Sequence, residues 1–260
     1  MKKGRQTTIY PLGTTDYEEG SASGNQKVLN HLMLQELGFS EEEAAKLLVI
    51  IGGDQATVEK VRILKKFAAS CPHGYNRYEW VLPLIQLWHM GWSDLERILD
   101  THWGKDITDV STLAFVNETL GRKVKNVKRP DFYSAQSLVM DNLRAEVGNL
   151  WRYAVSPRVH HITNALLGDQ MLANSILRIR DSMIHYEFQS AIADGDIGRA
   201  MNVMNVRRSK YTNELLELAC NFEFEYSASL KEGILNNWLC NLTGNEGCWF
   251  PMDLMQEHSN

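Results

Sequence analysis

Apolar and polar positions in the first third of the chain follow the pattern of a strand, a helix and a second strand. Residues 47–51 are continuously aliphatic and are followed by two glycines and Asp54, which is typical of a strand buried on both faces. Residues 55–69 then carry an apolar side chain at every third or fourth position, as an amphipathic helix does. Residues 78–87 return to β-favouring types, and His89 lies just beyond them. We therefore expect a βαβ unit with a parallel pair of strands.

Weaker signals precede this unit. Residues 7–10 form a short β-type run, and residues 13–27 are rich in glycine and small polar residues, which is typical of a loop. The spacing predicts a helix over residues 28–36. Ser40, with Glu43 three residues later, predicts a helix start with a capping box.

From residue 93 onward the pattern predicts an almost entirely helical chain. Ser93 is expected to cap a helix that ends at Thr101, and a loop rich in Lys and Arg is expected at residues 121–130. Further helices are predicted at residues 131–147, 172–188, 211–222, 227–239 and 253–258. The predicted fold class is α/β and predominantly helical, with a small remnant sheet. Its expected parts are a short strand and flexible loop at 1–27, an α/β core at 28–104 and a helical region at 105–260.

Composition and charge place the chain among ordinary globular proteins. Its 260 residues carry 27 Lys and Arg against 32 Asp and Glu, which gives a net charge of −5. This balance argues against coating nucleic acid through bulk charge, although it allows local basic patches. The longest apolar run, residues 47–51, is far shorter than the roughly 18 residues that a membrane span needs. No secretory signal is expected either, because no apolar stretch follows the basic pair near the start.

The cysteines indicate an intracellular protein with reduced thiols. They form no CxxC pair, and their spacing suits neither a disulfide scaffold nor a zinc finger. The four are Cys71, Cys220, Cys240 and Cys248.

Asp54 is the strongest single candidate for chemistry. A carboxylate at the carboxyl end of a parallel strand lies where open α/β sheets bind their ligands, and its oxygens suit Mg²⁺ or Mn²⁺. The simpler interpretation is that Asp54 caps the helix beginning at Gln55. The two roles are compatible. The two glycines before Asp54 are not part of a phosphate-binding loop, since the downstream Gly-Lys-Ser/Thr is absent.

Three further residues are candidates for the same chemistry. His89 could orient a phosphate or a carboxylate, or be a satisfied histidine among apolar neighbours. Glu214 and Glu217 lie on the predicted helix 211–222, which could present an acid to the end of the sheet or form a solvated polar face.

The basic loop offers a candidate nucleic-acid contact. It contains five cations and no acid, so it could follow a phosphate backbone or serve only as a solubilising surface. The five are Arg122, Lys123, Lys125, Lys128 and Arg129.

Several segments together resemble a known family. The most specific are Asn213–Phe222, which reads NELLELACNF, and Ile234–Leu239, which reads ILNNWL. The others are Gly53–Thr57, Trp88–Met90, His102–Gly104 and Gln256–His258. From about Thr7 to Asn260 the chain resembles domain of unknown function family 6589, proteins of mushroom-forming fungi associated with transposable elements.

The resemblance implies a layout similar to a transposase of the ribonuclease H-like class. In such enzymes acids at strand ends and on a helix hold two divalent ions that activate water and stabilise the leaving oxygen. By this analogy Asp54 is a strand-end acid and metal ligand, with Mg²⁺ or Mn²⁺ as the cofactor. His89 matches a histidine after the next strand, and Glu214 or Glu217 matches the helical acid. DNA is the implied partner and the nucleus the implied location.

Two departures from the family pattern lead to a further expectation. An Asp-Asn segment usual in relatives lies upstream of where this chain begins, and relatives continue beyond its end. We therefore expect a truncated, inactive copy whose unpaired sheet edge allows self-association. The alternative is a non-enzymatic helical module that binds nucleic acid or protein.

Overall fold

A computed structural model of the chain describes residues 4–154, 170–206 and 226–257. The chain divides into two compact units. Unit 1 comprises residues 1–90, 192–197 and 214–260, and unit 2 comprises residues 91–191 and 198–213. The residues of unit 1 are therefore contributed by segments far apart in the sequence.

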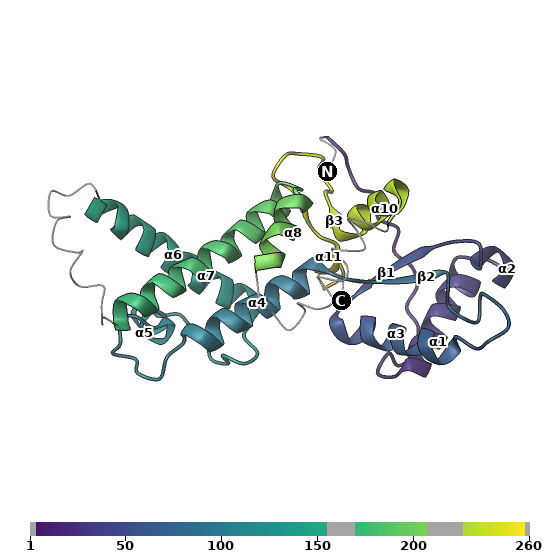
Figure 1. Cartoon of the computed structure of the whole chain (residues 1–260), viewed down its shortest axis with the longest axis horizontal. Helices are drawn as coiled ribbons and strands as arrows, with labels where there is room; N and C mark the ends of the chain where they lie inside the picture. Colours follow the sequence, from purple (N-terminus) through teal and green to yellow (C-terminus); the bar gives the residue numbers. More distant parts are fainter. Residues whose placement is uncertain (1–3, 155–169, 207–225, 258–260) are drawn as a thin grey trace. The chain divides into compact units, whose positions relative to one another are not determined.

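The predicted βαβ unit is confirmed in unit 1. Strand β1 (Val49–Gly53) and strand β2 (Val81–Ile85) are parallel, and helix α3 (Gln55–Ala68) connects them. Val49 pairs with Val81 and Gly53 with Ile85, so both strands end at the same edge (Figure 1).

The burial predicted for the first strand is wrong. All five residues of β1 are only partly buried, and Leu47 and Leu48 are exposed before the strand begins. The reason is that β1 has one strand neighbour, β2, in the part of the chain that the structure describes. The unbroken aliphatic run at residues 47–51 therefore predicted more burial of β1 than the structure shows.

The elements before the sheet differ from the prediction. Helix α1 (Ala22–His31) begins inside the expected loop, because the Ser21 side chain accepts the Gly24 N–H and caps it. It continues as a π-helical turn, η1 (Leu32–Glu36). The predicted strand at residues 7–10 is wrong. Those residues form no strand, although the Thr7 N–H donates to the Asn241 carbonyl.

Helix α2 (Glu41–Ala44) confirms the predicted capping box. The Ser40 hydroxyl accepts the Glu43 N–H, and the Glu43 carboxylate accepts the Ser40 N–H in return. The helix is nevertheless only four residues long.

The core of unit 1 packs α1, η1, α2 and α3 against β2 and the loop before it. Val58, Val61 and Leu64, at helical spacing on α3, are buried. Tyr75 stacks on Trp80 with ring centroids 5.5 Å apart, and the Trp80 indole donates to the Tyr75 carbonyl. The loop before β2 thus closes one end of the core with aromatic rings, whose burial is strongly stabilising.

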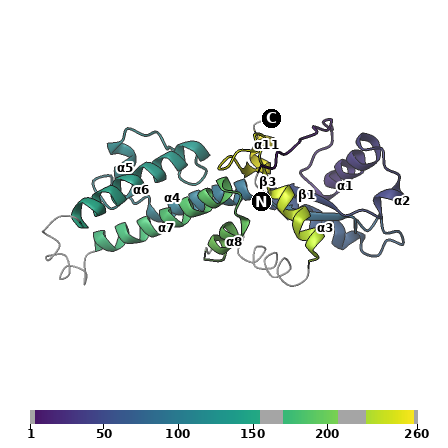
Figure 2. The ribbon, with the colours of Figure 1, turned by 90° about the horizontal axis from the view of Figure 1, so that it is seen from above.

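The end of the chain completes unit 1. Helix α10 (Ala228–Trp238), the yellow-green helix beside β1 in Figure 2, contacts β1, and the Trp238 indole donates to the Ile85 carbonyl at 2.8 Å. Two-residue strands β3 (Leu239–Cys240) and β4 (Phe250–Pro251) then pair antiparallel. They lead into helix α11 (Met252–Glu257), close to the predicted helix at 253–258.

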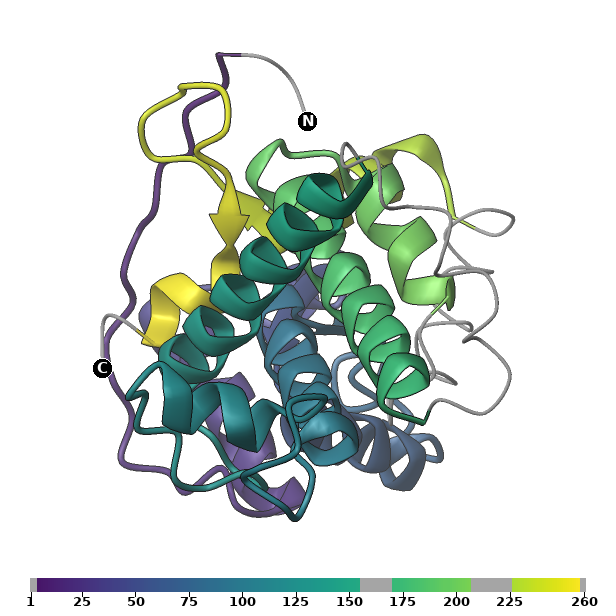
Figure 3. The same cartoon turned by 90° about the vertical axis from the view of Figure 1, so that its left-hand side faces the viewer.

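The described part of unit 2 is helical. Its helices are α4 (Leu87–His102), which begins in unit 1, α5 (Leu113–Thr119), α6 (Phe132–Ala154), α7 (Gln170–Ala193) and α8 (Ile197–Val206). Figure 3 shows α6 and α7 lying alongside each other. An ion pair from Arg178 to Glu146 links these two helices, and one from Arg97 to Asp181 links α4 to α7.

Ser93 does not cap α4 as predicted, because the helix begins six residues earlier, at Leu87. The predicted helix at 211–222, with Glu214 and Glu217, lies outside the described residues.

Within the described ranges no helix is long and apolar enough to cross a bilayer. The predominantly helical α/β class is confirmed.

Candidate functional site

The shared edge of β1 and β2 brings Asp54 and His89 into one region of unit 1. Asp54 follows the last residue of β1, and His89 lies in the first turn of α4, shortly after β2. Both side chains line a cavity of about 270 Å³. The carboxyl ends of parallel strands are where open α/β sheets bind ligands, so the edge itself is a candidate site.

Asp54 is a helix cap in this structure. Its Oδ1 accepts the Thr57 N–H at 2.7 Å, which satisfies one of the unpaired donors at the start of α3. Burial alone would raise the pKa of Asp54. The hydrogen bonds from Thr57 and the positive charge of His89 outweigh burial and lower the pKa below its ordinary value. Asp54 therefore carries its negative charge while it lines the cavity.

Asp253, at the start of α11, caps α4 from a distant part of the chain. Its Oδ1 accepts the Trp88 N–H at 3.1 Å and its Oδ2 accepts the His89 N–H at 3.0 Å. The same Oδ2 lies 2.9 Å from the His89 Nδ1. A buried carboxylate at the positive end of a helix is favourable, and here it also fixes the orientation of the imidazole.

Glu257, at the end of α11, lies on the other side of the same ring. Its Oε1 is 3.9 Å from the His89 Nε2, and its side chain is about half exposed. Burial alone would lower the pKa of His89. The hydrogen bond to Asp253 and the charges of Asp253, Asp54 and Glu257 raise the pKa above its ordinary value. The imidazolium is therefore stabilised by the carboxylates that surround it.

The cavity combines these ionisable groups with an apolar wall. Its lining includes Leu29, Ile51 and Val61, together with a fourth acid, Glu19. Gly52 also lines it, and a Cβ built at Gly52 would lie 1.8 Å from the Gln86 Nε2. The absence of a side chain at Gly52 thus lets the buried Gln86 side chain approach the strand.

A family model described as a family of unknown function, DUF6589, matches residues 1–163 and 155–260. The chain belongs to DUF6589. Searches of the curated proteins and of the solved structures return no match to it. The match includes both units and every residue of the cavity in unit 1. Because the family description gives no activity, the function of this DUF6589 chain has to be inferred from its sites.

Three of the four acids of the DUF6589 cavity were missed from the sequence, and one of them, Glu19, was predicted only as part of a loop. Asp253 and Glu257 were predicted only as parts of a helix, while Glu214 and Glu217 were predicted as the helical acids. The signal for Glu257 was present in Gln256–His258, one of the segments that carry the family resemblance. The contact between α11 and His89 could not be predicted from the spacing of neighbouring residues, because it depends on the tertiary packing of α11 against the end of the sheet.

The basic loop of the DUF6589 chain is held in place by polar groups of the loop itself and of helices α5 and α6. Val124 is buried and donates its N–H to the Asn117 Oδ1, and the Asn126 Oδ1 accepts two N–H groups farther along the loop. Arg122 forms an ion pair with Asp141. The other four cations are exposed and form no ion pair with the residues that the structure describes. They are Lys123, Lys125, Lys128 and Arg129.

Proposed function

We propose that this DUF6589 chain is a transposase-like protein, derived from a fungal transposable element, that processes DNA with Mg²⁺ or Mn²⁺ at the cavity of unit 1. The observation that carries the proposal is the presence of Asp54, from the end of β1, and Glu257, from α11, on one cavity with His89. It leads us to propose activity where the sequence alone led us to expect an inactive copy. The origin and the ribonuclease H-like relationship rest on the resemblance alone.

The arrangement suits this class because its acids come from a strand end and from a helix. Asp54 and Glu257 lie far apart in the sequence, yet both line the strand-end cavity. Ribonuclease H-like transposases use acids placed in this way to hold divalent ions. Glu257 thereby becomes the proposed helical acid, and Glu214 and Glu217 stay as predictions outside the described residues.

The carboxylates suit a hard cation with an open coordination sphere. Among the described residues, no three His, Cys, Asp or Glu side chains form a group that could hold a metal ion. Mg²⁺ is commonly held by one or two carboxylates, with water and substrate phosphates as the other ligands, and Asp54 and Glu257 supply two carboxylates. When bound, such an ion activates water and stabilises a leaving oxygen.

Asp253 and Glu257 orient the imidazole of His89 and raise its pKa. Asp253 holds the Nδ1 side of His89, so Asp253 is a positioning residue. The Nε2 side lies toward Glu257 at the exposed end of the cavity. The raised pKa of His89 favours the protonated imidazole, which is the form that could donate a proton from Nε2 to a phosphate oxygen.

The test is nicking of supercoiled DNA by the full chain with Mn²⁺, comparing Asp54→Asn with Asp131→Asn. Asparagine keeps the helix cap in both variants but removes the charge. Asp131 is the matched control, because its Oδ1 accepts the Ser134 N–H in the same way but lies in unit 2. We expect Asp54→Asn to reduce nicking by at least about tenfold and Asp131→Asn to leave it unchanged. Equal rates in all three proteins would overturn the proposal.

The four unpaired cations of the basic loop favour a second candidate, a non-enzymatic module that binds nucleic acid. Each phosphate contact steepens the dependence of affinity on salt. Replacing Lys123 and Lys125 by Gln should therefore weaken DNA binding for all sequences and flatten its salt dependence. DNA binding with no Mn²⁺-dependent nicking by the folded wild-type chain would favour this second function over the first.

A further inference from the structure

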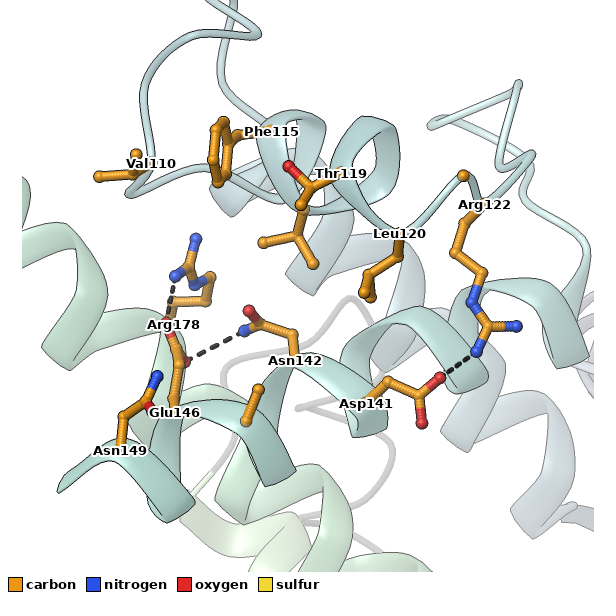
Figure 4. A pocket seen from close by; sticks show the side chains of 13 residues that line it. Val110, Phe115, Thr119, Leu120, Arg122, Asp141, Asn142, Glu146, Asn149 and Arg178 are labelled. Atoms are coloured by element: carbon orange, nitrogen blue, oxygen red, sulfur yellow. Dashed lines mark hydrogen bonds and ion pairs between the residues drawn. The ribbon is translucent and has the colours of Figure 1, made fainter. Parts of the chain in front are cut away.

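Unit 2 contains a second and larger cavity. Its volume is about 690 Å³, which is within the range of small-molecule sites. Figure 4 shows side chains of α5 and of the loop before it facing side chains of α6 across the cavity. Arg178, from α7, closes one end.

Arg178 points to an occupant that accepts hydrogen bonds. Its side chain is 3% exposed, and one guanidinium nitrogen pairs with Glu146. The other two nitrogens, Nε and Nη1, are buried and have no hydrogen-bond partner among the described residues. A buried donor without a partner is costly, and an acceptor bound in the cavity would satisfy it.

One side of the cavity is apolar and the other is polar. Val110, Phe115 and Leu120 provide apolar surface and one aromatic ring on the α5 side. Asn142 and Asn149 provide amide groups on the α6 side. A flat, partly apolar group with hydrogen-bonding edges matches both sides.

The charges around the cavity favour a ligand that places a negatively charged group at the rim. Inside, Arg178 and Arg122 are balanced by Glu146 and Asp141. Arg122 also begins the basic loop, whose other four cations have no ion-pair partner in the described ranges. The excess positive charge therefore lies along the chain that leaves the rim of the cavity.

We propose that this cavity binds one unpaired nucleotide of single-stranded DNA. The base enters beside Phe115, its acceptor atoms face Arg178, and the neighbouring phosphates lie along the basic loop. A base within a duplex cannot enter without leaving its stack. The inference deepens the proposed function and rests on DNA being the partner, but its geometry belongs to unit 2 alone.

The test is fluorescence anisotropy of the full chain with labelled oligothymidylate and with a labelled hairpin duplex, in EDTA. Ala145→Phe fills the cavity, because Ala145 lines it and is exposed on α6. Ser134→Phe is the control, since Ser134 is exposed on the same helix and does not line the cavity. Thermal unfolding of both variants verifies that they fold.

We expect oligothymidylate to bind wild type and Ser134→Phe equally, and Ala145→Phe about tenfold more weakly. The duplex should bind all three proteins alike, through the basic loop. Unchanged affinity of Ala145→Phe for oligothymidylate would overturn the inference, as would a loss of duplex affinity equal to the loss for the single strand. EDTA removes divalent ions, so this binding experiment tests the unit 2 cavity without the metal site of unit 1. A negative result in the binding experiment therefore does not decide the nicking experiment, and a negative result in the nicking experiment does not decide this one.

Discussion

The Asp253 carboxylate accepts hydrogen bonds from the first turn of one helix and from an imidazole. Two backbone N–H groups of α4 and the Nδ1 of His89 all lie within 3.1 Å of its oxygens. With a side chain that is only 4% exposed, Asp253 would be strongly destabilising without these partners. Its position therefore depends on α4 and His89, and the charge state of His89 depends on it.

The first prediction concerns the titration of His89. The hydrogen bond and charge of Asp253 help to raise the pKa of His89 above its ordinary value. In Asp253→Asn the pKa of His89 should fall, because burial still lowers it while the nearest negative charge is gone. NMR titration of the His89 ring measures this directly. Asp131→Asn serves as the control, and a His89 pKa unchanged by Asp253→Asn would contradict the account.

The same shift sets how stability depends on pH. A histidine whose pKa is raised by folding stabilises the folded state most below its unfolded pKa. That contribution is lost as pH rises through the folded pKa of His89. Denaturant unfolding over this range should show the loss in the wild type and a smaller loss in Asp253→Asn.

The second prediction is that two cysteines, Cys240 and Cys248, differ in their reactivity toward a thiol reagent. Cys240 is fully buried, and burial with the nearby charge of Asp253 raises the pKa of its thiol to about 12. Cys248 is exposed. Because the thiolate is the reactive form, N-ethylmaleimide should label Cys248 in the native protein and Cys240 only after unfolding. Peptide mapping by mass spectrometry reads out both sites. Native labelling of Cys240 at the rate of Cys248 would contradict the packing of β3.

At the scale of elements, two helical glycines have opposite surroundings, and the third prediction follows from them. A Cβ at Gly24 in α1 would lie 1.7 Å from the Glu18 carbonyl oxygen, whereas a Cβ at Gly148 in α6 would meet nothing within 4 Å. Gly148→Ala should stabilise the protein by about 0.5–1 kcal/mol through helix propensity. Gly24→Ala should destabilise it by about 1–3 kcal/mol, because backbone must move. Thermal unfolding of the two variants provides the comparison, and stabilisation by Gly24→Ala would refute the contact.

The fourth prediction concerns the ion pairs between α4 and α7. Burial alone would raise the pKa of Asp181. Hydrogen bonds from His102, Arg97 and Arg180 instead lower it to about 2. A carboxylate with a lowered pKa stabilises the fold above its unfolded pKa, and this is lost as pH falls from about 5 toward 2. The loss should be on the order of 2 kcal/mol in acid unfolding.

Asp181→Asn should unfold more easily at neutral pH and lose most of this acid dependence. Asp100→Asn is the control, because Asp100 is exposed on α4. Identical acid unfolding of wild type and Asp181→Asn would show that these ion pairs do not contribute.

Local patterns predicted the elements whose signals are local. The period of α3, its Asp54 cap and the Ser40 capping box each depend on residues within a few positions of one another. The start of α4 could not be predicted in this way. Its cap, Asp253, lies far along the chain, so Ser93 was the best local signal and was wrong.

At the scale of the whole molecule, sequence reasoning identified one side of the unit 1 cavity. Asp54 and His89 follow consecutive parallel strands, and topology alone predicts that they share an edge. Asp253 and Glu257 come from a short helix that reaches this edge after the chain has passed through unit 2. Their place depends on tertiary packing, which no spacing in the sequence encodes.

In the proposed function, the unit 1 cavity binds a divalent cation through Asp54 and Glu257. Calorimetric titration of the folded full chain with Mn²⁺ tests it most directly, using Asp54→Asn and Glu257→Gln, with Asp131→Asn as the control that keeps the same kind of helix cap. We expect wild type and Asp131→Asn to bind Mn²⁺ alike, and both cavity variants to bind at least about tenfold more weakly. Equal binding by all four proteins, or no binding by the folded wild type, would contradict it.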